Sequence, residues 1–244
     1  MELLINAFNT ILYQPLFNAL ILLYEYLPGH DFGVAVIVLT VLIRLILSPL
    51  MVQSIKSQKG LSEIQPKVQE IQSRNKEDKE KQAKEMMELY KKEKINPFGG
   101  CLPLLLQLPI LIALFQVFWR GFQPEMMASL YSFVPQPEAI NPYFLSLINL
   151  SEASIILALI AGAAQFFQSK MMIPQVKKPE KKDKTSQFSE MMQKQMLYFF
   201  PIFTVFILWR LPAAIALYWI ITALFSIGQQ YLIVRAPAKH QDEL

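Results

Sequence analysis

A single arginine, Arg44, lies within residues 34–51, which otherwise hold apolar side chains, small hydroxyl side chains and one proline. Placing a guanidinium in the middle of a bilayer costs about 2.5–3.5 kcal/mol on insertion scales, so something must compensate the charge. The usual partner is an acidic side chain on a neighbouring helix, but none of the apolar segments of this sequence contains Asp or Glu. The sequence therefore predicts that Arg44 has no internal ion-pair partner and marks a functional site.

Polar side chains recur at helical spacing around this charge. Thr40, Arg44 and Ser48 are separated by four residues each and lie along one face of a helix. Further hydroxyl, aromatic and amide side chains lie in three later apolar segments, at Gln107, Gln116, Gln165, Gln168, Tyr218, Thr222, Ser226, Gln229 and Gln230. Together these stripes could line one hydrated cavity around the guanidinium. The alternative is that they form only hydrogen bonds between helices, as is routine in membrane bundles.

The chemistry open to these residues is binding rather than catalysis. Intramembrane hydrolysis needs an activated nucleophile or paired carboxylates, but both histidines, His30 and His240, lie outside the apolar segments. The sequence shows no cluster of metal ligands and no phosphate-binding glycine loop, so we expect no metal, no cofactor and no enzyme activity. A pocket with one positive charge and no counter-charge can receive the counter-charge from a visitor, such as a protein segment with acidic residues.

The elements that carry these side chains are predicted to be membrane-spanning helices. Of the 244 residues, 53% are hydrophobic and 17% are charged, a balance typical of membrane proteins. A hydrocarbon core about 30 Å thick needs about 20 mostly apolar helical residues. Windows of this kind predict five spans, at 33–51, 98–118, 154–173, 196–212 and 213–234.

Two further helical regions are expected outside the hydrocarbon core. Residues 3–27 carry a polar stripe of Asn6, Thr10, Gln14 and Asn18, which favours a helix in the membrane interface, with a further span as the alternative. Residues 52–96 carry apolar side chains at helical spacing on both sides of a polar turn, which predicts an antiparallel hairpin with Pro66 bending or delaying its first arm. The hairpin either docks partners or only shields its own seam.

These elements predict the organisation of the whole chain. In order, it comprises an N-terminal interfacial helix and the approach to the first span at 1–32, the first span at 33–51, the hairpin at 52–96, the other four spans within 97–235, interrupted by a flexible basic loop at 174–195, and a tail at 236–244. Lys and Arg are retained on the cytoplasmic side of membranes. We therefore expect the hairpin, the basic loop and the C-terminus in the cytoplasm and the N-terminus outside.

Four stretches of this sequence resemble the YidC family of membrane protein insertases. They are DFGVAVIVLTVLIRLILSPL, QPKVQEIQ, MMELYKKEKINPFGGCLPLLLQLPILIALFQVF and LPAAIALYWI with QQYLIVR, and the similarity extends over residues 14–235. The resemblance implies an all-α polytopic protein of the bacterial inner membrane, with five transmembrane helices around a hydrophilic groove. It also implies that Arg44 is the groove arginine, that Thr40, one turn earlier, matches a groove-lining threonine, and that Gln107 matches a polar position of the second span.

The resemblance also implies a function and partners. Many relatives have a Tyr-Tyr pair where this chain has Tyr218 and Trp219. With Ser48, Gln165 and Thr222 from the stripes, these residues complete the expected substrate-binding groove. The implied function is insertion and folding of inner-membrane proteins, alone or with the Sec translocon. The expected partners are nascent membrane proteins, the ribosome and membrane lipids, but not DNA. The competing hypothesis is a small-anion channel or carrier that uses Arg44 as its binding charge.

Overall fold

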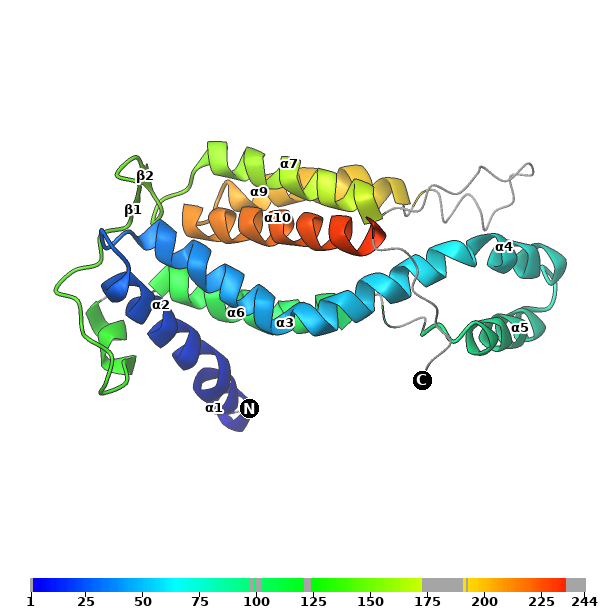
Figure 1. The fold of residues 1–244 in the computed structure, drawn as a ribbon, viewed down its shortest axis with the longest axis horizontal. Helices are drawn as coiled ribbons and strands as arrows, with labels where there is room; N and C mark the ends of the chain where they lie inside the picture. The colour runs from blue at the N-terminus through cyan, green and yellow to red at the C-terminus, as the bar shows by residue number, and fades with distance from the viewer. Residues whose placement is uncertain are drawn as a thin grey trace.

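The structure, a computed structural model, describes residues 2–96, 99, 102–120, 124–172, 191 and 193–235. Within these residues the chain is mostly helical, and its long helices form one elongated bundle with a pair of helices projecting from one end (Figure 1). Of the basic loop expected at 174–195, only 191 and 193–195 are among the described residues, and the tail expected at 236–244 lies outside them.

The elements follow one another with short connections. They are α1 (Glu2–Phe8), the π-helical turn η1 (Asn9–Tyr13), α2 (Gln14–Tyr26), α3 (Phe32–Glu63), α4 (Gln65–Arg74), α5 (Lys79–Lys92), α6 (Leu102–Arg120), the 3-10 turn η2 (Pro124–Ser129), β1 (Tyr143–Phe144), β2 (Ile148–Asn149), α7 (Ile155–Met172), the π-helical turn η3 (Gln195–Phe199), α9 (Phe200–Leu208) and α10 (Ala213–Arg235).

Four helices of the described chain are long and apolar enough to cross a membrane. They are Glu2–Tyr26, Phe32–Glu63, Ile155–Met172 and Ala213–Ile233, whereas the apolar helices Leu105–Trp119 and Gln195–Leu208 are shorter. The predicted polytopic all-α architecture is confirmed at this level. The set of five spans stays a prediction, because the N-terminal helix also qualifies and the described parts of the spans expected at 98–118 and 196–212 are the shorter helices just named.

The first predicted span belongs to a longer helix, α3, that links the bundle to the projecting pair. Asp31 caps its N-terminus by accepting a hydrogen bond from the backbone of Val34 at 2.9 Å. The helix bends along its length (Figure 1), and the proline inside it, Pro49, provides the cause because it removes a backbone donor. After Glu63 the helix is interrupted for one residue, Ile64, and α4 begins at Gln65. Pro66 lies in the first turn of α4, where its missing N–H removes no helical hydrogen bond.

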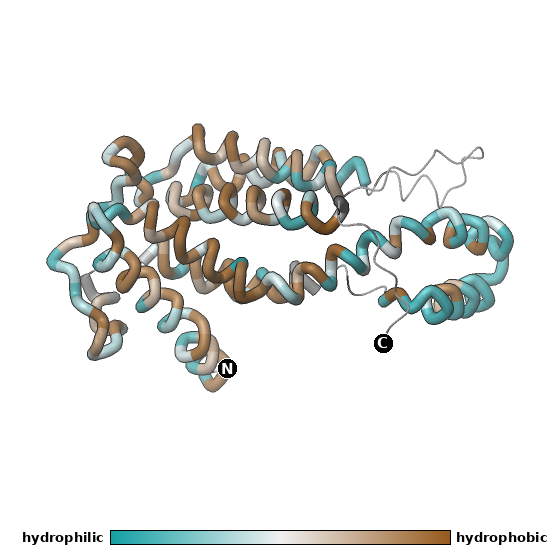
Figure 2. The backbone as a smooth tube through the Cα atoms, in the orientation of Figure 1, coloured by the Kyte–Doolittle hydropathy of each residue, from teal (hydrophilic) through white to brown (hydrophobic). Residues whose placement is uncertain are grey.

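The projecting pair, α4 and α5, is the hydrophilic end of the molecule, as the teal colour in Figure 2 shows. Arg74 donates to Glu85 at 2.6 Å and Lys67 to Glu93 at 2.5 Å, contacts that require the two helices to run antiparallel. These hydrogen bonds lower the pKa of both glutamates. Their contribution to stability is therefore present above the ordinary carboxyl pKa and is lost as the pH falls through the lowered values.

The polar stripe on the N-terminal helix has a structural use that its spacing did not indicate. The side chain of Asn18 is buried, donates to the backbone oxygen of Ser129 at 3.1 Å and accepts from the backbone of Tyr131 at 2.6 Å. Gln14 also donates to the Ser129 oxygen at 3.2 Å. Half of the stripe thus holds the connection between α6 and α7, instead of facing water or lipid headgroups.

Small residues allow the helices of the bundle to approach closely. The helix α10 packs between α3 and α7, and α9 packs on α7. In α7, a Cβ atom added to Gly162 would overlap the Val205 side chain of α9 and lie 3.1 Å from the backbone oxygen of Pro201. Such close contacts are the main source of helix association in lipid.

Gly162 and Gly228 give a matched test of this packing. We expect Gly162→Ala to destabilise the protein by about 1–3 kcal/mol, because the new methyl group meets a backbone oxygen that cannot move away. A Cβ on Gly228, also inside a helix, meets nothing within 4 Å, so Gly228→Ala should be neutral or stabilising by up to about 1 kcal/mol. Thermal unfolding of the two variants in detergent measures the difference. Equal effects would contradict the packing of α7 on α9.

Candidate functional site

Arg44 lies inside the bundle, on the part of α3 that faces α6 and α10. The residue is only 6% exposed. Its guanidinium donates a hydrogen bond to the Oε1 atom of Gln107 on α6, at 3.2 Å. It forms no salt bridge with a carboxylate anywhere in the described ranges, so its hydrogen-bond partner there is a neutral amide.

The same amide joins a third helix to the arginine. The Nε2 atom of Gln107 donates to the hydroxyl of Tyr218 on α10, whose side chain is fully enclosed. The orientation of the amide follows from the chemistry of its neighbours, because a guanidinium can only donate and a hydroxyl can accept. Arg44, Gln107 and Tyr218 therefore form one chain of hydrogen bonds that ties α3, α6 and α10 together.

The two hydroxyl residues one turn on either side of Arg44 have other partners. Thr40 is buried and donates to the backbone oxygen of Val36 in its own helix, at 2.6 Å. Ser48 accepts a hydrogen bond from the amide of Gln229 on α10, at 2.8 Å. The expected stripe on α3 thus lies along one side of the helix contact with α10, but only its arginine joins the network of Gln107.

Gln165 and Trp219 form a separate pair between α7 and α10. The indole N–H of Trp219 donates to the Oε1 atom of Gln165 at 3.0 Å. Six of the eight expected groove residues therefore fall into three hydrogen-bonded groups that share α10, whereas Thr40 bonds within α3 and the hydroxyl of Thr222 has no partner in the described chain. Gln165 is not in the group that contacts Arg44.

Trp219 also borders an apolar cavity of about 270 Å³. The cavity is lined by residues of α6, α9 and α10 and of the turn before α10, namely Leu111, Ile112, Phe115, Thr204, Ile207, Leu208, Leu211, Ile215 and Trp219. Its walls are almost entirely hydrocarbon, in contrast to the polar network around Arg44. One residue, Trp219, thus has its polar atom in a hydrogen bond to α7 and its ring against an apolar space.

The polar residues of α10 share one face. At 100° per residue, Tyr218, Trp219, Thr222, Ser226, Gln229 and Gln230 fall within an arc of about 120°. Two buried atoms on this face, the hydroxyl oxygen of Thr222 and the Oε1 atom of Gln230, have no hydrogen-bond partner within the described chain. Gln229 and Gln230 were visible in the sequence as part of the stripe but were not among the expected groove residues. The helical spacing of these two residues from Tyr218, Thr222 and Ser226 is the signal in the sequence that could have placed them in the groove.

The described residues contain no group of three or more His, Cys, Asp or Glu side chains that could hold a metal ion. The polar residues brought together are hydrogen-bonding amides, hydroxyls and one guanidinium. Such a set can bind polar or anionic groups, and it contains no nucleophile paired with a base.

Most of the chain is similar to a known family: residues 22–241 match the family described as 60Kd inner membrane protein. The chain is 35% identical to the membrane protein insertase YidC of Fusobacterium nucleatum over 208 residues, which are 85% of this chain and 88% of that protein. It is 37% identical to the protein of the same name from Clostridium tetani over 213 residues, covering 87% of this chain and 86% of that protein.

A longer relative matches over most of this chain but only part of its own length. The membrane protein insertase YidC of Histophilus somni is 37% identical over 227 residues, which are 93% of this chain and 37% of that protein. The chain thus spans little more than a third of that relative.

The hydrogen-bond chain through Gln107 can be tested with a double-mutant cycle. We expect Gln107→Ala and Tyr218→Phe to be non-additive in unfolding free energy, with a coupling of about 0.5–3 kcal/mol, because each removes the same contact. The matched control pairs Tyr218→Phe with Gln229→Ala, which belongs to a different hydrogen-bonded group, and these two should add to within about 0.5 kcal/mol. Additivity in both cycles would show that Gln107 does not bridge to α10.

Proposed function

The chain belongs to the YidC family of membrane protein insertases, and from this premise we propose that it inserts clients through a hydrated groove built around Arg44. Its family makes it a membrane protein insertase and not an enzyme, and its apolar helices agree with a multi-pass membrane protein. The proposal concerns the groove residues, the course of the client and the partners.

The observation that carries the proposal is the buried guanidinium of Arg44 with a neutral partner. A charge removed from water without a counter-charge is costly. The hydrogen bond that Arg44 donates to Gln107 satisfies one of the five guanidinium N–H groups and leaves the net charge in place. Water in the groove and, transiently, an acidic or carbonyl group of a client would supply the remaining stabilisation.

The unpartnered atoms on α10 support a hydrated groove. A buried hydroxyl or amide without a hydrogen bond costs about 1–3 kcal/mol. The free hydroxyl of Thr222 and the free Oε1 of Gln230 lie on the same helical face as Tyr218. Water or the backbone of a client would satisfy them, so the polar face of α10 would extend the groove beyond Arg44.

The physical role of such a groove is to shorten the apolar path of a polar client segment. Backbone groups and charged side chains lose their hydration when they cross hydrocarbon. A groove that holds water part of the way into the bilayer reduces that loss, and Arg44 attracts acidic residues of the segment. Release of the apolar helix of the client into lipid then supplies the driving free energy, at about 25 cal/mol per Å² of apolar surface, and no nucleotide is needed.

The apolar cavity beside Trp219 supports a lateral exit. It lies between α6 on one side and α9 and α10 on the other, and α9 packs mainly on α7. A client helix leaving the polar network would meet hydrocarbon walls here before it meets lipid. Trp219 would guide it, since its indole N–H bonds to the polar side chain of Gln165 while its ring lines the cavity.

The remaining parts of the proposal concern topology and partners. We place the hairpin of α4 and α5 and the C-terminus in the cytoplasm and the N-terminus outside. The reason is that Lys and Arg cluster in 52–96 and 174–195 and are retained on the cytoplasmic side. The hairpin, joined directly to the groove helix α3, is suited to meet ribosomes delivering nascent chains. Cooperation with the Sec translocon is part of the same proposal.

Substitutions of Arg44 test the electrostatic role. We expect Arg44→Ala to lower the insertion of clients with acidic outer tails by on the order of tenfold, because a hydrogen bond to a charged group contributes about 1.5–3 kcal/mol and about 1.4 kcal/mol is a factor of ten. Arg44→Lys should retain much of the activity because the charge persists. The measurement is insertion of such clients into vesicles that contain the purified protein.

Two controls separate the alternatives. Clients whose outer tails lack acidic residues should respond less to Arg44→Ala, and an equal response of both client sets would remove the electrostatic role. Arrested client chains should crosslink to photoreactive probes at Thr40 and Tyr218. Anion flux through protein-containing vesicles without any client crosslinking would instead favour the anion channel or carrier.

A further inference from the structure

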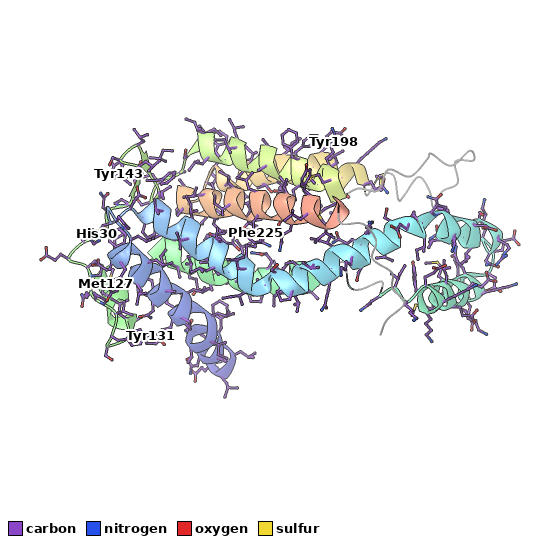
Figure 3. All side chains as sticks on the ribbon, viewed as in Figure 1. His30, Met127, Tyr131, Tyr143, Tyr198 and Phe225 are labelled. Atoms are coloured by element: carbon purple, nitrogen blue, oxygen red, sulfur yellow. The ribbon has the colours of Figure 1, made fainter. Side chains whose placement is uncertain are left out.

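A short β-hairpin lies at the end of the bundle opposite α4 and α5. Its strands, Tyr143–Phe144 and Ile148–Asn149, pair antiparallel, with Phe144 opposite Ile148. Residues 145–147 connect the strands, and the backbone of Leu147 donates to the oxygen of Phe144 at 3.0 Å, so Leu145 and Ser146 are the central residues of a β-turn. Figure 3 shows Tyr143 at this extremity of the molecule, on the same side as His30.

The turn adopts a backbone conformation that its residues disfavour. Leu145 has a φ of 49° and Ser146 a φ of 58°. β-turns with positive φ at both central positions favour Asn-Gly or Gly-Gly. The reason is that a Cβ atom crowds the backbone in this region of φ. A leucine persists in such a position only where its surroundings hold it.

Contacts with the start of α3 and the start of α10 hold the hairpin in place. The Oδ2 atom of Asp31, the residue that caps α3, accepts a hydrogen bond from the backbone of Leu145 at 2.6 Å. The ring of Phe144 occupies the space that a Cβ atom on Gly33 would need. The backbone oxygen of Leu150, just after the hairpin, accepts from Ala214 of α10 at 3.0 Å. The hairpin is therefore fixed to α3 and α10.

This fixed element presents uncharged, largely apolar side chains outward. Leu145 is 60% exposed and Leu147 is 81% exposed, while Tyr143 is also exposed. No charged residue occurs from 139 to 151. Figure 2 shows the segment as a brown patch among the paler and teal connections at this end. We call Tyr143, Leu145 and Leu147 the hairpin tip.

The neighbouring surface indicates what covers the hairpin tip. The chain runs from the hairpin into α7, a candidate membrane span that begins at Ile155. The first two turns of α7 expose Ile156 and Leu159, which in a spanning helix face lipid. The tip is fixed to the same end of the bundle and combines aliphatic side chains with a tyrosine, the combination that suits the boundary between headgroups and acyl chains.

We propose that the hairpin tip inserts into the headgroup–acyl boundary of the leaflet at this end of the bundle and anchors the protein at a set depth. The anchor acts on α3, because Asp31 binds both the turn and the first turn of that helix. Arg44 lies thirteen residues further along α3, or about 20 Å at 1.5 Å per residue. Only this last consequence, control of the depth of Arg44, rests on the proposed function.

A fluorescent probe at position 147 tests the location directly. In a Cys101→Ala background, which removes the single cysteine, Leu147→Cys is labelled with an environment-sensitive dye and the full chain is reconstituted in phosphatidylcholine vesicles. The control is Glu138→Cys, an exposed charged position in the same connection between α6 and α7. Quenching is measured with iodide on both sides of the bilayer and with lipids carrying a spin label near the headgroup or deep in the acyl chain.

We expect the shallow lipid label to quench the probe at 147 at least threefold more than the deep label does. We expect iodide to quench the probe at 147 at least threefold less than the probe at 138. Iodide quenching equal at both positions would overturn the proposal by placing the tip in water. Protection of position 147 from both iodide and lipid labels would also overturn it, because protein would then cover the tip.

A second pair of variants separates lipid contact from the strained turn. Ser146→Gly relieves the unfavourable φ of 58° at a position outside the hairpin tip, and should leave the lipid quenching of a probe at 147 unchanged. Leu145→Asp should shift that probe toward iodide by at least threefold. No client is present in these measurements, so failure of the insertase proposal would leave their outcome unaffected.

Discussion

A positive charge buried among apolar helices constrains the rest of this structure. Arg44 must keep its charge, because a guanidinium is not deprotonated in proteins, and the described chain offers it no carboxylate. The bundle meets this constraint with Gln107, whose amide faces Arg44 with its oxygen and Tyr218 with its nitrogen. The neutral bridge orients the guanidinium without cancelling its charge.

The helix α10 relates this polar network to its surroundings. Its small residues, among them Ala213, Ala214 and Ala216, are fully buried and allow close packing, while its polar residues share one face. Trp219 on that face donates to Gln165 and borders the apolar cavity. The pair of Gln165 and Trp219, which is separate from the network of Arg44, therefore lies at the edge of the apolar cavity.

The helix α3 relates the two ends of the molecule to the site. It begins at the cap of Asp31, which also binds the strained turn of the β-hairpin, and it continues without interruption past Arg44 and the bend at Pro49 to Glu63. A displacement of either end of α3 would also move Arg44, because a continuous helix transmits movement along its axis. The position of Arg44 within the bundle and the position of the projecting pair, α4 and α5, are thus properties of one element.

By itself, the sequence determined the class of this protein and the helical stripes, and it predicted a site at Arg44. These depend on local composition and on the helical period, which are properties of the chain alone. Only the tertiary structure decided that Gln107 contacts Arg44, that Gln165 pairs with Trp219 instead, and that Asn18 holds a distant connection. The physical reason is that helical spacing defines which residues share a face, whereas the neighbour of that face depends on how small residues such as Gly162 and Gly33 let the elements pack.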